Sequence, residues 1–411
     1  MSWLLYGANG YTGELAAREA VKRGLRPVLA GRSRAPVERL ALELGLEARA
    51  FALDDPAAVR AGLAGQSLVL HCAGPFSATA RPMLEACLAA RAHYLDITGE
   101  IAVFELAQSL DARARAAGVL LCPGVGFDVV PTDCVAAALH AALPGATHLA
   151  LGFDGSSSFS RGTGRTMVEG LKDGGTVRRD GRLVRVPLGW RERRIDFGGG
   201  EKLGVTIPWG DVSTAYHTTG IPNVEVYIPM SPRRVRSLRR LNLVRPLLGL
   251  GPVQSWLKSR VDRQPPGPDE QQRARTPTHV WGEARDAQGT VKTARITVAN
   301  GYSVTVHAAL GIVERLLRGD APAGATTPAR LMGARYVETC SASSSRRRAG
   351  CAIRTCSRSC RAPACAAATS WRARRRCCAR AASASWTAAT ACACTAGTRR
   401  PPTVATAASS C

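Results

Sequence analysis

The sequence predicts an α/β protein whose first domain is a doubly wound parallel sheet and whose second domain is an inserted α+β unit. Three observations lead to this prediction: a glycine-rich turn after an N-terminal apolar run, a regular alternation of strand-like and helix-like segments, and a change of pattern after Asp128. A chain of 411 residues is long enough for two domains. The expected organisation is a first domain at 1–128, a second at 129–300, a returning helix at 301–339 and a tail at 340–411.

The turn lies in residues 3–13, which read WLLYGANGYTG and are typical of a phosphate-binding loop. Gly7 permits the tight turn from strand to helix, Gly10 leaves room for a pyrophosphate, and Gly13 lets the helix pack on the strand. The first N–H groups of that helix would then point at the anion. The predicted loop contacts come from Gly7, Ala8, Asn9, Gly10, Tyr11, Thr12 and Gly13.

Strand-like and helix-like segments continue to alternate after the loop, which favours right-handed βαβ units and a Rossmann-type sheet. Ligands bind such sheets at the carboxyl ends of the strands, so the residues that follow each strand form the predicted site. Further strands are expected at 26–33, 47–53, 67–72, 93–97 and 118–122, with helices at 12–24, 78–92 and 101–117.

The end of the second strand indicates which dinucleotide binds. NAD-dependent enzymes usually carry an acidic residue there for the ribose 2′-hydroxyl, whereas this chain has Arg32 and Ser33. A guanidinium suits a 2′-phosphate as a fixed charge and bidentate donor, so we predict NADP (NADPH) as the cofactor. Asp54, after the third strand, is expected near the adenine ring. The fourth strand is followed by Cys72, Ala73, Gly74 and Pro75, which complete the predicted cofactor contacts.

A specific resemblance emerges from the motifs GANGYTG, AGRS, HCAGPF, YLDITGE and PGVGFDVVPTD, which follow one another along the first domain. Together they resemble the saccharopine dehydrogenase-like oxidoreductases, and within them a bacterial subgroup of trans-acting enoyl reductases of lipid biosynthesis. Further matching segments are SRGTGRTMVEGL at 160–171, PWGDVSTAYHTTGIPNVEVY at 208–227 and GPDEQQRART at 267–276. The resemblance covers residues 2–339 and implies a nucleotide-binding domain followed by a mixed α+β domain.

The second domain is expected to begin with a helix at 129–142. Alternating segments separated by long loops favour a mostly antiparallel sheet. A helix at 303–318, with its apolar residues on one face, is expected to return to the first domain. The predicted strands of the second domain lie at 147–154, 221–228, 278–286 and 291–299.

Four residues are candidates for catalysis. Asp96 and Asp128 both follow strands at the cofactor edge, where a carboxylate can orient a substrate or relay a proton, although Asp96 in DITGE could equally cap the helix near residue 101. Tyr216 and His217 could donate a proton to a developing enolate or alkoxide, but ordinary structural roles are the favoured interpretation.

The segment 233–260 mixes arginines with leucines and one tryptophan. A helical lid packed on its own domain is the favoured interpretation, and peripheral contact with a membrane is the alternative. No window of 18 or more uncharged apolar residues predicts a transmembrane helix, and the N-terminus lacks the features of a secretory signal. We therefore expect a cytoplasmic protein.

The composition changes abruptly at residue 340. Residues 340–411 hold 10 of the 14 cysteines and 13 arginines, without Lys, Asp, Glu or His. Paired C-x-x-C ligand sets are absent, so no metal site is expected, and a disulfide framework does not suit a cytoplasmic protein. A reading-frame shift in a GC-rich gene explains this composition best, with an arginine-rich nucleic-acid tail as the alternative, and we expect the segment to be disordered.

Without the tail the charge is modest. The net charge of +24 includes +13 from residues 340–411, which leaves +11 for residues 1–339. That balance suits an anionic dinucleotide and does not require a nucleic-acid partner. We thus expect an NADP-dependent oxidoreductase that reduces an enoyl or carbonyl group of a lipid- or polyketide-derived small molecule. The alternatives are a non-catalytic NADPH sensor or scaffold and a saccharopine-type amino-acid dehydrogenase.

Overall fold

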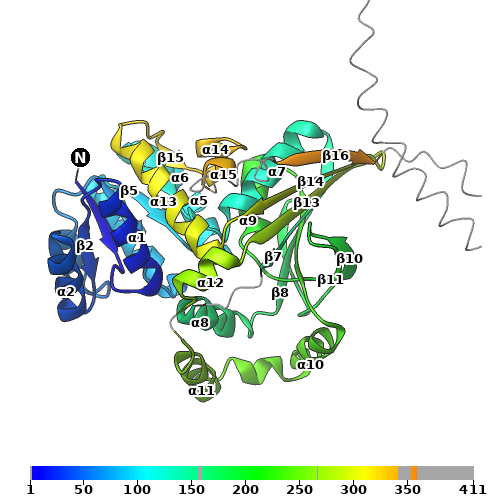
Figure 1. Ribbon diagram of the computed structural model, residues 1–411, viewed down its shortest axis with the longest axis horizontal. Coiled ribbons are helices and arrows are strands. Elements are labelled where there is room, and N and C mark those ends of the chain that lie inside the picture. The colour runs from blue at the N-terminus through cyan, green and yellow to red at the C-terminus, as the bar shows by residue number, and fades with distance from the viewer. Residues whose placement is uncertain (1, 156–159, 266, 341–352, 359–411) are drawn as a thin grey trace, which may run out of the picture. The chain divides into compact units, whose positions relative to one another are not determined.

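Seven parallel strands form the first sheet of the computed structural model, which describes residues 2–155, 160–265, 267–340 and 353–358 (Figure 1). The strand order is β15-β6-β5-β4-β1-β2-β3. The strands are β1 (Trp3–Tyr6), β2 (Val28–Gly31), β3 (Ala48–Ala50), β4 (Leu68–His71), β5 (His93–Asp96), β6 (Leu120–Cys122) and β15 (Gly324–Ala325). The prediction of a doubly wound parallel sheet is confirmed, and its order reverses between β1 and β4.

Helices cover both faces of this sheet because successive side chains of a strand point to opposite faces. In β1, Leu5 belongs to one buried apolar cluster while Leu4 and Tyr6 belong to the other. The helices are α1 (Tyr11–Lys22), α2 (Arg34–Leu44), α3 (Pro56–Gly62), α4 (Phe76–Ala90), α5 (Ile101–Ser109), α6 (Asp111–Ala117) and α13 (Gly301–Leu317). The single helix predicted at 101–117 is thus two helices, which meet at Leu110.

The second sheet has nine strands, in the main order β10-β11-β12-β7-β13-β14-β16, with β8 joined to β12 and β9 to β8. Only β7 and β12 pair in parallel, and the other pairs are antiparallel, in agreement with the expected mostly antiparallel sheet. The strands are β7 (Ala146–Gly155), β8 (Gly175–Arg179), β9 (Arg182–Val186), β10 (Glu192–Asp196), β11 (Glu201–Thr206), β12 (Asn223–Pro229), β13 (Thr278–Asp286), β14 (Val291–Val298) and β16 (Arg354–Arg358).

The strands β8 to β11 have no counterpart in the sequence prediction. Strand β10 reads ERRID and has only Ile195 fully buried, so its charged residues conceal the alternating pattern. Strand β9 is likewise mostly exposed. Such strands are fixed by their pairing with a neighbour rather than by burial of one face.

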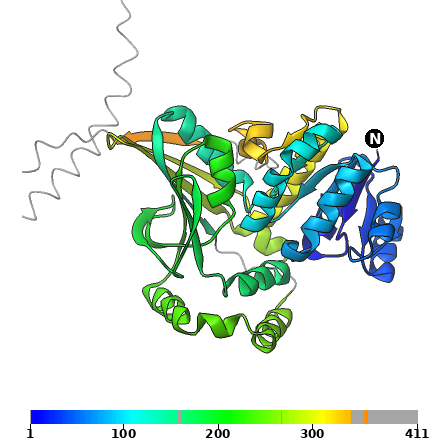
Figure 2. The same cartoon turned by 180° about the vertical axis from the view of Figure 1, so that it is seen from behind.

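Among the remaining helices, α7 and α9 pack on the second sheet. Helix α7 contacts β7, β13 and β14 as well as α9 (Figure 2). After β14, helix α13 packs on α1, and β15 pairs with β6, so the chain returns to the first sheet. These helices are α7 (Val130–Ala142), α8 (Arg161–Gly170), α9 (Asp211–Thr219), α10 (Pro232–Leu248), α11 (Gly251–Asp262), α12 (Glu270–Arg275), α14 (Pro328–Met332) and α15 (Tyr336–Cys340).

The structure corrects the expected disorder of residues 340–411 for the part of this segment that it describes. Cys340 is the last residue of α15, and residues 354–358 form β16, which pairs with β14. The expectation of disorder is wrong for this strand, because its backbone hydrogen bonds complete the edge of the second sheet. The rest of the expected tail, 341–352 and 359–411, lies outside the described residues. Among the described helices, none is both long and apolar enough to cross a bilayer.

Candidate functional site

The glycine-rich loop connects β1 to α1 at the carboxyl edge of the first sheet. Gly7 has a φ of +81°, a left-handed conformation that favours glycine. An ideal Cβ on Gly13 would lie 2.1 Å from the Gly7 carbonyl oxygen, so only glycine allows this approach of helix and strand. A Cβ on Gly10 would meet that oxygen at 3.3 Å and nothing else within 4 Å. The side of Gly10 is therefore open for a ligand.

The first turn of α1 offers backbone donors to that ligand. No side chain caps the helix at Gly10, and no acceptor within the described residues takes the N–H groups of Tyr11, Thr12 or Gly13. Gly10 itself and Asn9 are exposed, whereas Ala8 is buried. Exposed N–H groups at a helix start bind phosphate well, so the loop fits a pyrophosphate.

The loop after β4 lies directly beside the glycine-rich loop. The Cys72 N–H donates to the Tyr6 carbonyl oxygen at 2.8 Å, and a Cβ on Gly7 would lie 2.7 Å from the Ala73 nitrogen. Gly74 is exposed next to them, followed by Pro75. Burial raises the pKa of the Cys72 thiol, which favours its neutral form.

The residues predicted to select NADP lie at the same edge. Arg32 and Ser33 follow β2, and both are exposed. Arg32 forms no ion pair or hydrogen bond with the described residues, whereas Arg34 pairs with Glu38 at 3.0 Å. The guanidinium of Arg32 is therefore free to bind a phosphate. Asp54 is exposed beyond β3.

A segment of the second domain lies over the start of α1, a relationship that the sequence analysis did not assign. A Cβ on Gly267 would lie only 2.6 Å from the Tyr11 ring. The Tyr11 hydroxyl donates to the Pro268 carbonyl oxygen and accepts from Arg273 at 3.0 Å. The GPDEQQRART motif therefore covers the Tyr11 side chain at the end of the glycine-rich loop. The resemblance of this motif to the family motif was the signal in the sequence that could have indicated this contact.

Tyr302, in the first turn of α13, also covers the Tyr11 side chain. Its ring meets that of Tyr11 edge to face, with centroids 5.1 Å apart. The Tyr302 hydroxyl accepts from the backbone N–H of Ser160, the N-cap of α8. The motif at 160–171 thus also begins next to the loop.

Asp96 has its carboxylate fully committed to structural hydrogen bonds. Its Oδ1 accepts from the N–H groups of Thr98 at 3.0 Å and Gly124 at 2.8 Å, and its Oδ2 accepts from the Tyr94 hydroxyl at 2.6 Å. Burial raises its pKa to about 6. Asp96 therefore ties the loops after β5 and β6 together and is a positioning residue.

Glu100, from the same DITGE motif, caps α4 rather than the helix that follows it. Its two carboxylate oxygens accept from the N–H groups of Phe76 at 2.9 Å and Ser77 at 2.7 Å. Thr166 of α8 approaches Glu100 Oε1 at 3.4 Å. Burial raises the pKa of Glu100. The sequence could not show this cap, because the helix lies 24 residues away from the carboxylate.

Asp128 has an uncommitted carboxyl group at the carboxyl edge. Its Oδ2 lies against Gly99, where an added Cβ would come within 3.0 Å, and within the described residues no hydrogen bond reaches either oxygen. Only its backbone carbonyl is engaged, by Trp209 Nε1 at 2.8 Å. Burial raises the pKa of Asp128 to about 7. Such a group can give or take a proton near neutral pH.

Aromatic side chains adjoin Asp128. The Phe127 and Phe153 rings meet at 5.5 Å between centroids, and Phe153 meets Trp209 at 5.1 Å. These three rings come from the loop after β6, from β7 and from the loop before α9. They form an apolar wall next to the Asp128 backbone.

Tyr216 and His217 do not join Asp96 and Asp128. Arg178 stacks over the Tyr216 ring at 4.2 Å, and His217 Nε2 lies 3.6 Å from Glu105 Oε1. His217 and the Ser213 hydroxyl, together with Arg178, lower the pKa of Glu105 to about 2. This cluster ties α9 and β8 to α5, so Tyr216 and His217 lie among structural contacts.

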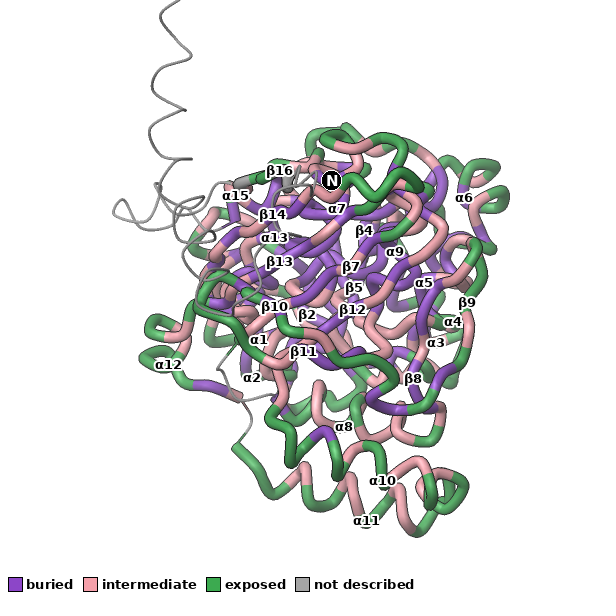
Figure 3. The backbone as a smooth tube through the Cα atoms, turned by 90° about the vertical axis from the view of Figure 1, so that its right-hand side faces the viewer, coloured by how far each residue is buried: buried purple, intermediate pink, exposed green. Residues whose placement is uncertain are grey.

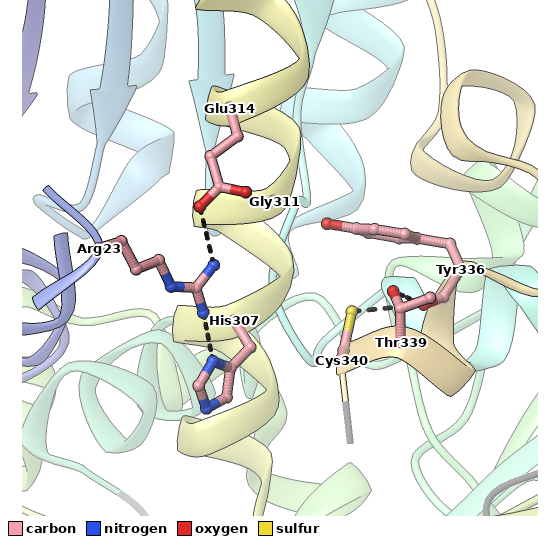
Figure 4. Close-up of a pocket in the computed structure, with 7 residues that line it drawn as sticks. All are labelled: Arg23, His307, Gly311, Glu314, Tyr336, Thr339 and Cys340. Carbon is pink, nitrogen blue, oxygen red and sulfur yellow. Dashed lines mark hydrogen bonds and ion pairs between the residues drawn. The ribbon is translucent and has the colours of Figure 1, made fainter. Parts of the chain in front are cut away.

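A cavity of about 220 Å³ lies away from these residues (Figure 4). It opens between Arg23, just past the end of α1, and residues of α13 and α15. The Arg23 guanidinium there is held by Glu19 at 2.9 Å and Glu314 at 3.3 Å, and it also contacts His307. Because Arg23 follows the opposite end of α1 from Gly10, this cavity is not part of the glycine-rich site. No group of side chains suited to a metal ion lies within the described residues.

Comparison with known proteins supports the assignment of the first domain. Residues 3–122 match the family model for the saccharopine dehydrogenase NADP binding domain. A human saccharopine dehydrogenase-like oxidoreductase is 30% identical over 150 residues, which are 32% of this chain and 35% of that protein. A trans-acting enoyl reductase of Mycobacterium tuberculosis is 31% identical over 140 residues, 32% of this chain and 33% of that protein. The matches thus span about a third of the length of these relatives.

The fold of a larger part of the chain is shared with a solved structure. The apo saccharopine dehydrogenase (L-Glu forming) of Saccharomyces cerevisiae has a TM-score of 0.58 at 11% identity, covering 87% of this chain and 99% of that chain. At this identity the likeness shows the fold alone. The family match confirms the prediction of NADP as the cofactor, because residues 3–122 match the saccharopine dehydrogenase NADP binding domain and their loop geometry suits a dinucleotide phosphate.

Proposed function

We propose that this protein is an NADP-dependent oxidoreductase that reduces an enoyl or carbonyl group of a lipid- or polyketide-derived molecule. One observation carries the proposal: the uncapped start of α1 and the uncommitted carboxyl group of Asp128 lie at the same carboxyl edge of one parallel sheet. The first suits a dinucleotide phosphate, and the second suits proton transfer.

The cofactor contacts follow from the loop. The N–H groups of Tyr11, Thr12 and Gly13 would hold the pyrophosphate, and Arg32 would pair with the 2′-phosphate. Bound NADPH supplies a hydride. The β4 loop at 72–75 and the Tyr11 ring border the space in which it would lie.

Asp128 is the proposed proton donor. Reduction of an enoyl or carbonyl group by hydride leaves a negative charge that must be protonated, and a carboxyl group with a pKa of about 7 is protonated in part of the molecules at neutral pH. Asp96 would hold the loop that carries Gly124 and Asp128, while Asp128 alone would reach the substrate.

The substrate class rests on two supports. The apolar wall of Phe127, Phe153 and Trp209 adjoins Asp128 and suits a hydrocarbon chain better than an amino-dicarboxylate. The name of the mycobacterial relative, trans-acting enoyl reductase, points the same way. The proposal includes a cytoplasmic location, which fits the free thiols of Cys72, Cys87, Cys122 and Cys134.

The test is a fluorescence titration with NADPH and NADH, followed by assays of NADPH oxidation with enoyl-thioester, keto-thioester and amino-dicarboxylate substrates. The proposal expects tighter binding of NADPH than of NADH, and oxidation with one of the thioesters that Asp128→Asn slows without weakening NADPH binding. NADPH binding without any oxidation would instead indicate a sensor, and turnover restricted to the amino-dicarboxylates would indicate a saccharopine-type dehydrogenase.

A further inference from the structure

Helices α10 and α11 contain almost no fully buried residues. Over 17 residues α10 buries only Val235, and the 12 residues of α11 bury none. In Figure 3 both helices lie at one edge of the described structure, and nearly their whole length is coloured green and pink, for exposed and intermediate residues. Most helices in proteins are stabilised by packing of an apolar face, and within the described residues the outer face of this pair has no partner that covers it.

Large apolar side chains are exposed where the two helices meet. Leu243 is 86% exposed and Trp256 57%, and three further side chains between them are at least 41% exposed. Leu243, Leu247 and Leu250 follow one another at helical spacing of four and three residues. The complete set, named here the apolar tip, is Leu243, Val244, Leu247, Leu250 and Trp256.

Arginines continue this face toward the start of α10. Arg236 and Arg240 precede Leu243 at the same helical spacing, and both are exposed and form no ion pair with the described residues. Across residues 231–263 there are nine Lys and Arg side chains and a single acidic residue, Asp262. Asp262 is already paired with Arg165 of α8 at 2.7 Å. The surface therefore carries a strong excess of positive charge next to exposed leucines.

We infer that the apolar tip and the arginines of α10 form a docking surface for an anionic lipid membrane. Leucine and tryptophan would enter the interface of the bilayer while the arginines contact acidic headgroups. A second copy of this chain is a poorer occupant, because it would bring a surface of the same charge. Membrane docking is a binding function that does not require the proposed reaction.

The docking surface is connected to the carboxyl edge of the first sheet through α8. Glu169 of α8 pairs with Lys258 of α11 at 2.5 Å and accepts from the hydroxyl of Ser77, in the first turn of α4, at 3.4 Å. Helix α8 also packs along α11. A membrane held at α10 and α11 would thus lie on the side from which a lipid substrate could reach the cofactor. This consequence, unlike the docking itself, rests on the proposed function.

The experiment is co-flotation of the full chain with vesicles of phosphatidylcholine alone or with phosphatidylglycerol. Leu243→Ser/Leu247→Ser and Arg236→Glu/Arg240→Glu should each weaken binding to the anionic vesicles by at least about tenfold. The matched controls are Leu42→Ser, at an 85% exposed leucine of α2, and Arg39→Glu/Arg60→Glu. The control variants should bind like the parent chain, and all variants should keep NADPH affinity, which separates loss of docking from loss of the proposed function.

The leucine variant, Leu243→Ser/Leu247→Ser, is decisive. The 13 arginines of residues 340–411 can add purely electrostatic binding, and substitution of the leucines leaves that contribution unchanged. Quenching of tryptophan fluorescence by brominated lipids supplies a second readout. The fraction of the fluorescence that these lipids quench should be smaller in Trp256→Phe than in the parent chain. Binding that neither α10 variant weakens would overturn the inference, as would no preference for the anionic vesicles. A concentration-dependent dimer abolished by Leu243→Ser/Leu247→Ser would overturn it in favour of a second copy.

Discussion

Gly13 faces the carbonyl oxygen of Gly7 so closely that a Cβ on Gly13 would lie 2.1 Å from that oxygen, whereas a Cβ on Gly10 would meet it at 3.3 Å. Two glycines of one loop therefore have different roles. Gly13 is required for α1 to pack on β1, and Gly10 is required for a ligand to approach α1.

Substitution of these two glycines should separate folding from binding. Gly10→Val should leave the thermal midpoint nearly unchanged and abolish NADPH binding, because its side chain would fill the space of the pyrophosphate. Gly13→Ala should lower the thermal midpoint because its Cβ collides with Gly7. Gly145→Val, at a glycine with nothing within 4 Å of its Cβ, is the control. Unchanged NADPH affinity in Gly10→Val would refute the assignment of the loop.

Removal of Arg32 should discriminate between the two dinucleotides. Arg32→Ala is expected to weaken NADPH binding by about 1.5–3 kcal/mol, the usual contribution of a charged hydrogen bond, and to leave NADH binding nearly unchanged. Isothermal titration calorimetry measures both affinities. Arg34→Ala is the matched control, because Arg34 is already paired with Glu38. An equal loss for both cofactors would mean that another residue binds the 2′-phosphate.

Activity should depend on pH through Asp128. Burial raises its pKa to about 7, so the carboxyl group is protonated below that pH and reductive turnover should fall as the pH rises through about 7. Asp128→Asn should be slow at every pH and should lose this inflection. The profile of kcat against pH is the measurement, and a variant that keeps the inflection would exclude Asp128 as the donor.

Stability should depend on pH through the same residue. Between about pH 4 and pH 7 the folded chain holds a proton on Asp128 that the unfolded chain has released, so the free energy of unfolding should decrease as the pH rises across this window. Asp128→Asn should flatten this decrease. Urea denaturation at pH 5 and pH 8 measures the effect, and parallel pH slopes for parent and variant would contradict the raised pKa.

Asp96 and Tyr94 should be energetically coupled because the Tyr94 hydroxyl donates to Asp96 at 2.6 Å within the core. Tyr94→Phe and Asp96→Asn should each reduce the free energy of unfolding by about 1–3 kcal/mol, and the double variant should lose less than the sum. A double-mutant cycle in urea measures this coupling. Additive losses would show that the hydrogen bond does not stabilise the loops.

Removal of residues 359–411 should leave a cooperative thermal transition. Residues 1–358 form one compact unit with its own contacts, including the pairing of β16 with β14. Truncation after Arg358 is compared with truncation after Cys340, which also removes β16 and should lower the midpoint. Loss of cooperativity in the chain truncated after Arg358 would show that residues 359–411 contribute to the fold.

Local sequence was sufficient for those features that depend on neighbouring residues. The apolar runs of β1, β2, β4 and β5 are short and continuous because both faces of a parallel strand are buried, and the glycine spacing of the loop reflects contacts within seven residues. The strands β9 and β10 escaped prediction because charged residues occupy their exposed faces.

Tertiary structure decided which candidate residues meet. Asp128 and Gly99, Glu100 and the start of α4, and Tyr11 and Gly267 are distant in the sequence, and their contacts exist only because the strands and the second domain place them together. Tyr216 and His217 were chosen for their chemistry, and the packing of α9 on α5 assigns them to Glu105 and Arg178 instead. The sequence by itself determined the sheet, the phosphate loop and the cofactor class, because each depends on local spacing and periodicity. Only the folded chain decided which carboxyl group remained uncommitted, because that depends on hydrogen bonds between distant segments.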